Sequence, residues 1–319
     1  MSPSDCTIGV DVGGTKIAAG LVRPQGEVLE RRIVPTLPER GGEAVLRDAL
    51  ALAETLLAQA RARGLNVGGI GIGVCELVDP HGRVMSEQTV HWRGLPVQER
   101  FAALAPAVVE ADSRAAAFGE FACGAARSFR SFYYVTVGTG IGGCWMLDGV
   151  PFVGATGATG TIASSPTVVL CEDCGTSRAA VLEEVASGPA LVARYNRKAS
   201  ASARSAEEVI CAAVRGDPDA DWVVDTAVES LGAALGFLVN VLDPEALVVG
   251  GGLGSSPGGF LDRLVPVIRR QVWSEINRGL PIIRASLAAD SGFVGAALLA
   301  QRRLECTVGR VARGTLPLT

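Results

Sequence analysis

Two glycine-rich segments of the sequence contain the residue types that bind phosphate groups. The first is Asp11-Val12-Gly13-Gly14-Thr15-Lys16, and the second is Gly138-Thr139-Gly140-Ile141-Gly142-Gly143. Glycine has no Cβ and tolerates positive φ, so the main chain can curl and direct successive N–H groups at a phosphate. A third cluster, Gly250-Gly251-Gly252, directly follows an apolar stretch. One such turn alone would favour an ordinary hairpin, but three together favour nucleotide binding.

The glycine clusters match neither of the two common nucleotide-binding signatures. The sequence has no G-x-x-x-x-G-K-[ST] segment, and the first glycines lead into a further β-branched stretch instead of a helix. This pattern predicts a β-hairpin over residues 7–22, with the glycines at its turn.

Two aspartates follow predicted strands, where carboxylates can do chemistry. Asp11 ends the first strand, and a carboxylate there can hold a hydrated Mg²⁺. Asp112 follows a second apolar strand and precedes a helix predicted over residues 113–121. It can be the general base that accepts a proton from an attacking hydroxyl, or simply the N-cap of that helix. The residue types alone leave both roles open.

The segments around these residues predict a mixed α/β protein in which glycine turns follow strands. Apolar side chains at helical spacing predict a helix over residues 42–63, whereas residues 67–74 form an apolar, glycine-rich strand. Residues 150–178, rich in Gly and Thr, predict a long loop region. The other predicted strands are 28–34, 108–111, 132–137 and 246–249, and the other predicted helices are 179–197, 205–215, 219–241 and 292–304.

Length and composition limit the possible classes of protein. A chain of 319 residues, 48% apolar and 19% charged, can form two packed domains. Its net charge of −4 argues against binding a nucleic-acid backbone, which needs a basic face. No apolar run reaches the ~18 residues that span a bilayer, and the first residues are unlike a secretory signal. We therefore expect a cytoplasmic protein whose eight cysteines are reduced.

In their order and spacing, these segments resemble the ROK family of the actin-like ATPase superfamily, over nearly the whole chain. Ile8–Lys16 and Gly138–Gly143 resemble the two phosphate segments of the family, and Leu247–Leu253 resembles its adenosine-side segment. Val109–Glu120 resembles the block around the family's general base, and Glu183–Ala190 also fits.

The resemblance implies two α/β domains of the actin-like ATPase (ribonuclease H-like) type that flank an interdomain cleft. We expect an N-terminal domain over residues 1–115, completed by the C-terminal segment 300–319, and a C-terminal domain over residues 116–299. By the same resemblance, ATP lies mostly on the C-terminal domain, and the acceptor lies at the domain interface.

The resemblance also implies an ATP-dependent kinase that transfers the γ-phosphoryl group to a sugar hydroxyl, often the 6-hydroxyl of a hexose, and that forms a homodimer. Asp112 is then the catalytic base, and Asp11 holds the Mg²⁺ of the nucleotide. The implied nucleotide-binding residues are Asp11, Gly13, Gly14, Thr15, Lys16, Gly138, Thr139, Gly140, Gly142, Gly251 and Gly252.

The sequence departs from the family at positions that contact the sugar. The family commonly has Asn directly before the catalytic Asp, and here that residue is Ala111. The glutamate and histidine of the family's G-E-x-G-H segment are Thr161 and Ser164, while a further sugar-binding glutamate is retained as Glu183. Sites built to hydrogen-bond hydroxyls discriminate strongly through such groups, so these changes argue against glucose as the substrate.

Upstream, Cys75-Glu76 replaces a proline–glycine pair of the family. The carboxylate of Glu76 can face the ammonium group of an amino sugar, and the altered pocket suits a carbocyclic analogue (a cyclitol) equally well. Alternatively, Glu76 is a solvated loop residue. The predicted substrate residues are Glu76, Ala111, Thr161, Ser164 and Glu183, and the predicted role is in specialised metabolism such as antibiotic biosynthesis.

The zinc site that many family members contain is incomplete in this sequence. Of its three cysteines and one histidine, only Cys171 and Cys174 remain, and Ser164 stands at the histidine position. Two thiolates do not complete a tetrahedral zinc site. We therefore expect ATP and Mg²⁺, but not zinc, as cofactors.

Two other functions are compatible with the family resemblance. Some family members are transcriptional repressors, but these carry an additional helix-turn-helix domain, whereas this sequence enters its first strand by residue 7. A catalytically silent ligand-binding protein would explain the altered sugar positions, although the retained Asp11, Asp112 and glycine segments argue against it. A small-molecule kinase with an altered acceptor pocket is the preferred interpretation.

Overall fold

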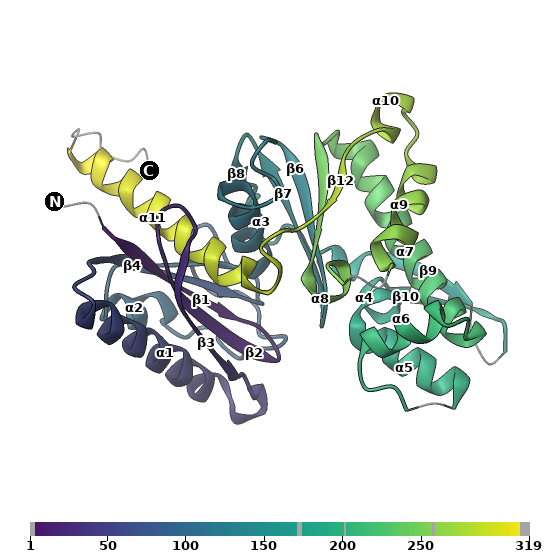
Figure 1. Ribbon diagram of the computed structural model, residues 1–319, viewed down its shortest axis with the longest axis horizontal. Helices are drawn as coiled ribbons and strands as arrows, with labels where there is room; N and C mark the ends of the chain where they lie inside the picture. Colours follow the sequence, from purple (N-terminus) through teal and green to yellow (C-terminus); the bar gives the residue numbers. More distant parts are fainter. Residues whose placement is uncertain (1–3, 171–173, 201, 257–258, 313–319) are drawn as a thin grey trace. The chain divides into compact units, whose positions relative to one another are not determined.

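The computed structural model describes residues 4–170, 174–200, 202–256 and 259–312 (Figure 1). The chain forms two compact units. Unit 1 comprises residues 1–128, 149–159 and 289–319, and unit 2 comprises residues 129–148 and 160–288. Each unit is built on a mixed β-sheet with helices, as the predicted fold class requires.

The sheet of unit 1 has the strand order β3-β2-β1-β4-β5. β1 and β2 form the predicted hairpin, which β3 extends in antiparallel fashion, whereas β4 pairs parallel to both β1 and β5. The carboxyl ends of β1, β4 and β5 therefore lie at one edge of the sheet. The strands are β1 (Cys6–Val12), β2 (Lys16–Val22), β3 (Val28–Pro35), β4 (Val67–Val74) and β5 (Ala107–Ala111).

The two faces of this sheet pack against different helices, α1 (Gly42–Ala62) and α11 (Ser291–Ala312), as Figure 1 shows. Successive side chains of a strand point to opposite faces. The even-numbered residues of β1 belong to the apolar core that α1 covers. Gly9 and Gly71 face α11, whose backbone lies so close that a Cβ at either glycine would collide with it. Asp11 follows Gly9 by two positions and therefore faces α11 as well.

The helix α3 (Asp112–Ala122) explains why the observed division differs from the predicted one. The predicted boundary after residue 115 falls inside α3, which belongs entirely to unit 1. A Cβ on Gly119 of α3 would lie 3.0 Å from the Cα of Gly295 in α11, so the two backbones are nearly in contact. The C-terminal part of unit 1 begins at residue 289, not at residue 300. The remaining elements of unit 1 are η1 (Pro38–Arg40), α2 (Val97–Ala102) and β8 (Val150–Pro151), and η3 (Ala288–Asp290) precedes α11.

Unit 2 contains a sheet with the order β12-β11-β6-β7 and a separate hairpin of β9 and β10. Its apolar core is formed by the sheet and by the helices around α7, which contacts α4, α5, α6 and α9. The strands are β6 (Phe132–Val137), β7 (Ile141–Leu147), β9 (Pro166–Leu170), β10 (Ser177–Val181), β11 (Ala246–Gly250) and β12 (Ile282–Arg284). The helices are η2 (Ile162–Ser164), α4 (Glu183–Ala186), α5 (Gly188–Ala199), α6 (Ala206–Val214), α7 (Pro218–Leu242), α8 (Gly251–Gly254), α9 (Phe260–Gln271) and α10 (Glu275–Arg278).

The helix α7 is long and apolar enough to cross a membrane by length and composition alone. Half of its most apolar window is buried inside the protein, and the helix contacts four other helices of unit 2. These contacts are typical of the core helix of a globular unit.

Two predicted segments differ from the observed structure. The predicted loop over residues 150–178 contains β9 and the start of β10. The single helix predicted over residues 179–197 is instead the end of β10 followed by α4 and α5. The helical conformation is interrupted at Ser187, which has an extended backbone. Ser187 caps α5, because its side chain accepts a hydrogen bond from the N–H of Ala190. Pro189, in the first turn of α5, is compatible only with a helix start at this point.

Candidate active site

Asp11 lies at the end of β1, beside the first turn of α11. A Cβ on Gly292, the second residue of α11, would overlap the carboxylate of Asp11, so glycine is needed there for the carboxylate to fit. Burial and the neighbouring charge of Asp112 raise the pKa of Asp11 to about 7, while Lys16 acts in the opposite direction. The start of a helix favours a negative charge, but here it does not outweigh the burial.

Asp112 is the first residue of α3, and Ala111 occupies the N-cap position without a side-chain hydrogen bond. The prediction that Asp112 is the N-cap is therefore wrong by one residue. Its Oδ1 accepts a hydrogen bond from the N–H of Ser113, at 2.5 Å. Burial, with a contribution from the charge of Glu76, raises the pKa of Asp112 to about 6, and the Ser113 hydrogen bond lowers it only in part.

Both aspartates lie beside Gly73 of β4. A Cβ on Gly73 would lie 3.5 Å from Oδ1 of Asp11 and 3.6 Å from the Cα of Asp112. The parallel pairing of β1, β4 and β5 explains this meeting, because Asp11 is opposite Gly73, and Gly73 is opposite Glu110, two residues before Asp112. The structure thus brings the predicted base and the predicted Mg²⁺ ligand together in unit 1.

The first glycine segment forms the turn between β1 and β2. The N–H of Gly13 donates to the carbonyl oxygen of Lys16 at 3.0 Å, and the buried Thr36 donates its Oγ1–H to the carbonyl oxygen of Gly13 at 2.6 Å. The N–H of Thr36 also donates to the carbonyl of Thr15. This anchoring on the inner side leaves the side chains of Thr15 and Lys16 exposed, where they can meet a phosphate.

The second glycine segment forms the turn between β6 and β7 in unit 2. The carbonyl of Gly138 accepts a hydrogen bond from the N–H of Gly188, the first residue of α5, at 2.8 Å. Thr139 is exposed at the tip of the turn, whereas Gly142 pairs with Thr136 inside the β6–β7 ladder. Of the nucleotide-binding residues predicted in this segment, Gly138, Thr139 and Gly140 therefore lie in the turn, whereas Gly142 lies in β7.

The second and third glycine clusters lie together in unit 2. A Cβ on Gly138 would lie 3.6 Å from the backbone nitrogen of Gly252. Gly251 has φ of +81°, and a Cβ there would collide with the backbone at Val137. Glycine is therefore required at position 251, both for its conformation and for the close approach of the two turns.

Glu183, predicted to contact the substrate, lies against the second glycine turn. Its Oε2 accepts a hydrogen bond from the N–H of Ile141 at 2.8 Å, and a Cβ on Gly140 would lie 2.8 Å from the same oxygen. Thr161 and Ser164, in the same unit, are exposed, and Ser164 donates its Oγ–H to the carbonyl of Thr161. The predicted substrate residues are thus divided between unit 2 and unit 1, which contains Glu76 and the buried Ala111.

Glu76 differs from both descriptions that the sequence suggested. It is only 6% exposed, so it is not a solvated loop residue. Its Oε1 accepts hydrogen bonds from the N–H groups of Thr89 and Val90, and its Oε2 accepts from the N–H of Gln88 and the hydroxyl of Ser86. These four donors match the acceptor sites of a carboxylate, which leaves Glu76 poorly suited to bind a substrate ammonium group directly.

The predicted remnant of a zinc site lies only partly within the described residues. Cys171 lies outside them, and Cys174 is exposed, with its Sγ 2.9 Å from Oγ1 of Thr176. In the described ranges there is no group of three or more His, Cys, Asp or Glu side chains that could hold a metal ion.

Several residues that shape this site were not predicted from the sequence. Gly292 makes room for the carboxylate of Asp11, and Thr36 anchors the first turn. Arg114, which is 1% exposed, donates hydrogen bonds to Glu110 and to the carbonyls of Val78 and Gly157. Only Arg114 has a sequence signal, since an arginine two residues after Asp112 interrupts an apolar helix face.

Comparison with known proteins places the chain in a family. The model of the ROK family matches residues 7–303. The chain belongs to the ROK family.

The relatives of this ROK protein include sugar kinases that match it over almost the full length. The glucokinase of Streptomyces coelicolor (strain ATCC BAA-471 / A3(2) / M145) is 34% identical over 321 residues, which cover 92% of this chain and 97% of that enzyme. The N-acetylmannosamine kinase of Escherichia coli (strain SE11) is 29% identical over 299 residues, covering 92% and 98%. The crystal structure of a ROK family glucokinase from Streptomyces griseus, in complex with glucose and AMPPNP, has a TM-score of 0.79 at 31% identity, covering 93% of this chain and 99% of that one. The predicted fold and enzyme class, an ATP-dependent phosphotransferase with an alcohol group as acceptor, are confirmed.

Proposed function

We propose that this ROK kinase phosphorylates a hydroxyl, the primary or 6-equivalent one, of an amino sugar rather than of glucose. The observation that supports a kinase most directly is the pair Asp11 and Asp112 in unit 1. Burial raises both of their pKa values, and Asp112 has a pKa of about 6. A carboxylate with such a pKa is ionised at neutral pH and is still basic enough to accept a proton.

In the proposed reaction, the acceptor hydroxyl attacks the γ-phosphorus of ATP. As the new oxygen–phosphorus bond forms, the hydroxyl proton passes to the carboxylate of Asp112, and the bond to the β-phosphate oxygen breaks to release ADP. Positioning and charge neutralisation supply most of the catalysis in such transfers. Asp112 is suited to its part because the Ser113 hydrogen bond fixes its orientation at the start of α3.

The glycine segments supply the proposed contacts to the phosphates. The turn at Gly13 and Gly14 is anchored from its inner side by Thr36, and the turn at Gly138 is anchored by the N–H of Gly188. Such anchoring holds main-chain N–H groups in place before the nucleotide binds. Asp11 offers hard oxygen donors of the kind that Mg²⁺ prefers, and Mg²⁺ would neutralise phosphate charge there.

The choice of an amino sugar rests on charge and on the altered sugar positions. After burial, the charge of Asp112 raises the pKa of Asp11, and the charge of Glu76 raises the pKa of Asp112. Burial, followed by the charges of Asp112, Glu76 and Asp11, raises the pKa of the Cys75 thiol beside them. A cationic acceptor would be attracted by this field without a direct ion pair to Glu76. Thr161, Ser164 and Ala111 replace the larger polar groups that the family resemblance associates with a neutral hexose.

Assays of ADP release with a panel of acceptors test the proposal. The panel comprises glucose, N-acetylmannosamine, amino hexoses and cyclitols, and the product is analysed for the position of its phosphate. We expect the highest kcat/KM for an amino hexose. A higher kcat/KM for glucose or for a cyclitol would refute the amino-sugar assignment, and ADP release that is unchanged in Asp112→Ala would refute the role of Asp112.

A cytoplasmic homodimer and a biosynthetic role in specialised metabolism complete the proposal. The relatives described above are a glucokinase and an N-acetylmannosamine kinase by name, so they do not by themselves support antibiotic biosynthesis.

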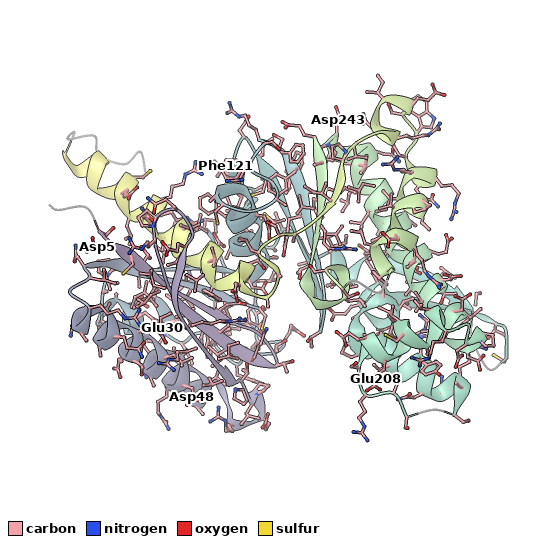
Figure 2. All side chains as sticks on the ribbon, viewed as in Figure 1. Asp5, Glu30, Asp48, Phe121, Glu208 and Asp243 are labelled. Carbon is pink, nitrogen blue, oxygen red and sulfur yellow. The ribbon has the colours of Figure 1, made fainter. Side chains whose placement is uncertain are left out.

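The support for a dimer is an apolar surface at one end of unit 2. Trp273 is 85% exposed and Ile276 is 89% exposed. The side chain of Asp243, at the end of α7 and labelled in Figure 2, binds Asn277 and holds α10 in place.

The mass of the protein in solution tests the dimer. We expect Trp273→Glu and Ile276→Glu to convert a dimer to a monomer in light scattering, whereas Val168→Glu, at another exposed apolar position, leaves the mass unchanged. A wild-type protein that is monomeric at micromolar concentration contradicts this part of the proposal.

A further inference from the structure

The segment between β4 and α2, residues 75–96, closes on itself at Glu76. Beyond Glu76 the chain turns back, with Val78 bridged to Val84 and with the N–H of Met85 donating to the carbonyl of Leu77 at 2.7 Å. The returning chain then passes the carboxylate of Glu76, which binds Ser86 and three successive N–H groups, those of Gln88, Thr89 and Val90. We refer to residues 86–90 as the clamped loop.

The clamped loop lies next to the predicted catalytic residues in unit 1. The Cγ2 of Thr89 would lie 2.8 Å from a Cβ on Gly14, so the loop packs against the first phosphate turn. The segment itself begins next to Asp112, because Glu76 follows Val74, which is opposite Ala111 in the β4–β5 pair. The clamped loop therefore lies against the first phosphate turn, in a segment that begins beside the proposed base.

The chain is anchored before and after the clamped loop, and between these two anchors Glu76 binds the loop itself. Before the loop, Arg114 binds the carbonyl of Val78 at 2.5 Å. After the loop, the buried Trp92 donates its Nε1–H to the carbonyl of Gly42 at 3.0 Å. Between these anchors, the three loop N–H groups converge on a carboxylate that is itself 6% exposed. Without the carboxylate, they would have to turn towards solvent, and the clamped loop would lose its shape.

We infer that Glu76 is a positioning residue, which holds the clamped loop as the acceptor-side wall of the active site. The acceptor part of this inference rests on the proposed function. Glu76 does not touch the substrate in this account; it acts through Thr89 and the main chain of residues 86–90. Loosening the loop should therefore weaken the acceptor complex more than the nucleotide complex, because the first phosphate turn keeps its own anchor, the hydrogen bond from Thr36 to Gly13.

The variant Glu76→Gln tests the inference because it preserves size, removes the charge and replaces one acceptor oxygen by an NH₂ group, which cannot accept from the loop N–H groups. Glu87→Gln is the matched control, since it makes the same chemical change at an exposed residue of the same loop. The first measurement is hydrogen exchange at the N–H groups of Gln88, Thr89 and Val90 in the full chain. We expect exchange at least about tenfold faster in Glu76→Gln, equivalent to losing one charge-assisted hydrogen bond, and no change in Glu87→Gln.

The second measurement is steady-state kinetics with the best acceptor of the panel. We expect the KM of the acceptor to rise about tenfold in Glu76→Gln, with the KM of ATP changed less than twofold. Unchanged exchange at the three N–H groups overturns the clamp. Equal rises in both KM values overturn the acceptor role, because they indicate a general loss of structure.

A milder variant covers the case in which Glu76→Gln does not fold. Ser86→Ala removes one of the four donors, and we expect the same pattern of exchange and KM values at about threefold. The exchange measurement needs no substrate, so it separates the two proposals. If the wild type phosphorylates nothing in the panel, the proposed function fails and the acceptor role falls with it, whereas faster exchange still supports the clamp.

Discussion

The charge of Asp11 destabilises the folded protein, and Asp11→Asn tests this directly. The pKa of Asp11 is raised from 3.8 to about 7 because burial disfavours the carboxylate and Asp112 repels it, while Lys16 offsets part of both effects. A carboxyl group whose pKa is higher in the folded than in the unfolded state makes its full contribution to the unfolding free energy at pH values below the unfolded pKa. That contribution is lost as the pH rises through the folded pKa. We therefore predict that the amide variant becomes more stable than the wild type as the pH is raised.

The size of the effect follows from the pH range below the folded pKa. Between pH 5 and pH 8, only the interval up to the pKa of about 7 contributes, and each pH unit corresponds to about 1.4 kcal/mol. The wild type should lose up to about 3 kcal/mol of unfolding free energy through Asp11. Asp112 titrates in the same range with the same sign, so the two carboxyls share the effect. We expect the variant's advantage to grow by about 1–3 kcal/mol from pH 5 to pH 8.

Urea denaturation at pH 5 and pH 8, without nucleotide or Mg²⁺, measures this difference for the wild type and for Asp11→Asn. Glu54→Gln makes the same change of charge at an exposed position of α1 and is the matched control. The reasoning is refuted if the stability of Asp11→Asn relative to the wild type is the same, or lower, at pH 8 than at pH 5. Kinase activity should be lost in the stabilised variant, because Asp11 is the proposed Mg²⁺ ligand.

Three further predictions concern catalysis and the support of the site. The kcat/KM should fall at least tenfold per pH unit below about pH 6, where Asp112 of the free enzyme becomes protonated, and Asp112→Asn should lower kcat by about 10²–10⁴-fold; a flat pH profile of kcat/KM from pH 4.5 to 8 contradicts the assignment. Gly292→Ala should lower kcat at least about tenfold because its Cβ overlaps the carboxylate of Asp11, whereas Gly279→Ala, which meets no atom closer than 3.9 Å, should not. Arg114→Met should lower the unfolding free energy by about 3 kcal/mol in urea denaturation, since it removes three buried hydrogen bonds; an effect as small as that of Arg100→Met, at an exposed ion pair, would contradict this.

The sequence predicts the elements that local patterns determine. The β1–β2 hairpin follows from β-branched stretches around a glycine turn, and α1, α6 and α7 follow from apolar spacing close to the observed bounds. The helix α9 was not predicted, and it contains Pro266 in its interior, which local propensity reads as a helix breaker. The end of unit 1 was misplaced because it depends on the close packing of α3 against α11, whose sequences are more than 160 residues apart.

The sequence predicts the position of the two aspartates but not their surroundings. Asp11 and Asp112 each follow a strand, and parallel strands bring such residues to one edge of the sheet. The role of Glu76 could not be predicted, because its donors lie 10 to 14 residues later in a segment without periodic pattern. Gly292 is 281 residues from Asp11, and no local rule marks a helical glycine as the space for a distant carboxylate.

The placement of glycines around the aspartates connects the fold to the proposed chemistry. Gly9 and Gly71 bring α11 against the sheet, and the same helix then closes over Asp11 at Gly292. This close packing removes water from the carboxylate, and burial is the largest cause of its raised pKa. A cation bound beside Asp11 and Asp112 would restore the interactions that burial removed, so it would lower both pKa values and bind more tightly as the pH rises. Mg²⁺ with its nucleotide, or a cationic acceptor, would therefore bring positive charge to a place where the fold has buried two carboxyl groups.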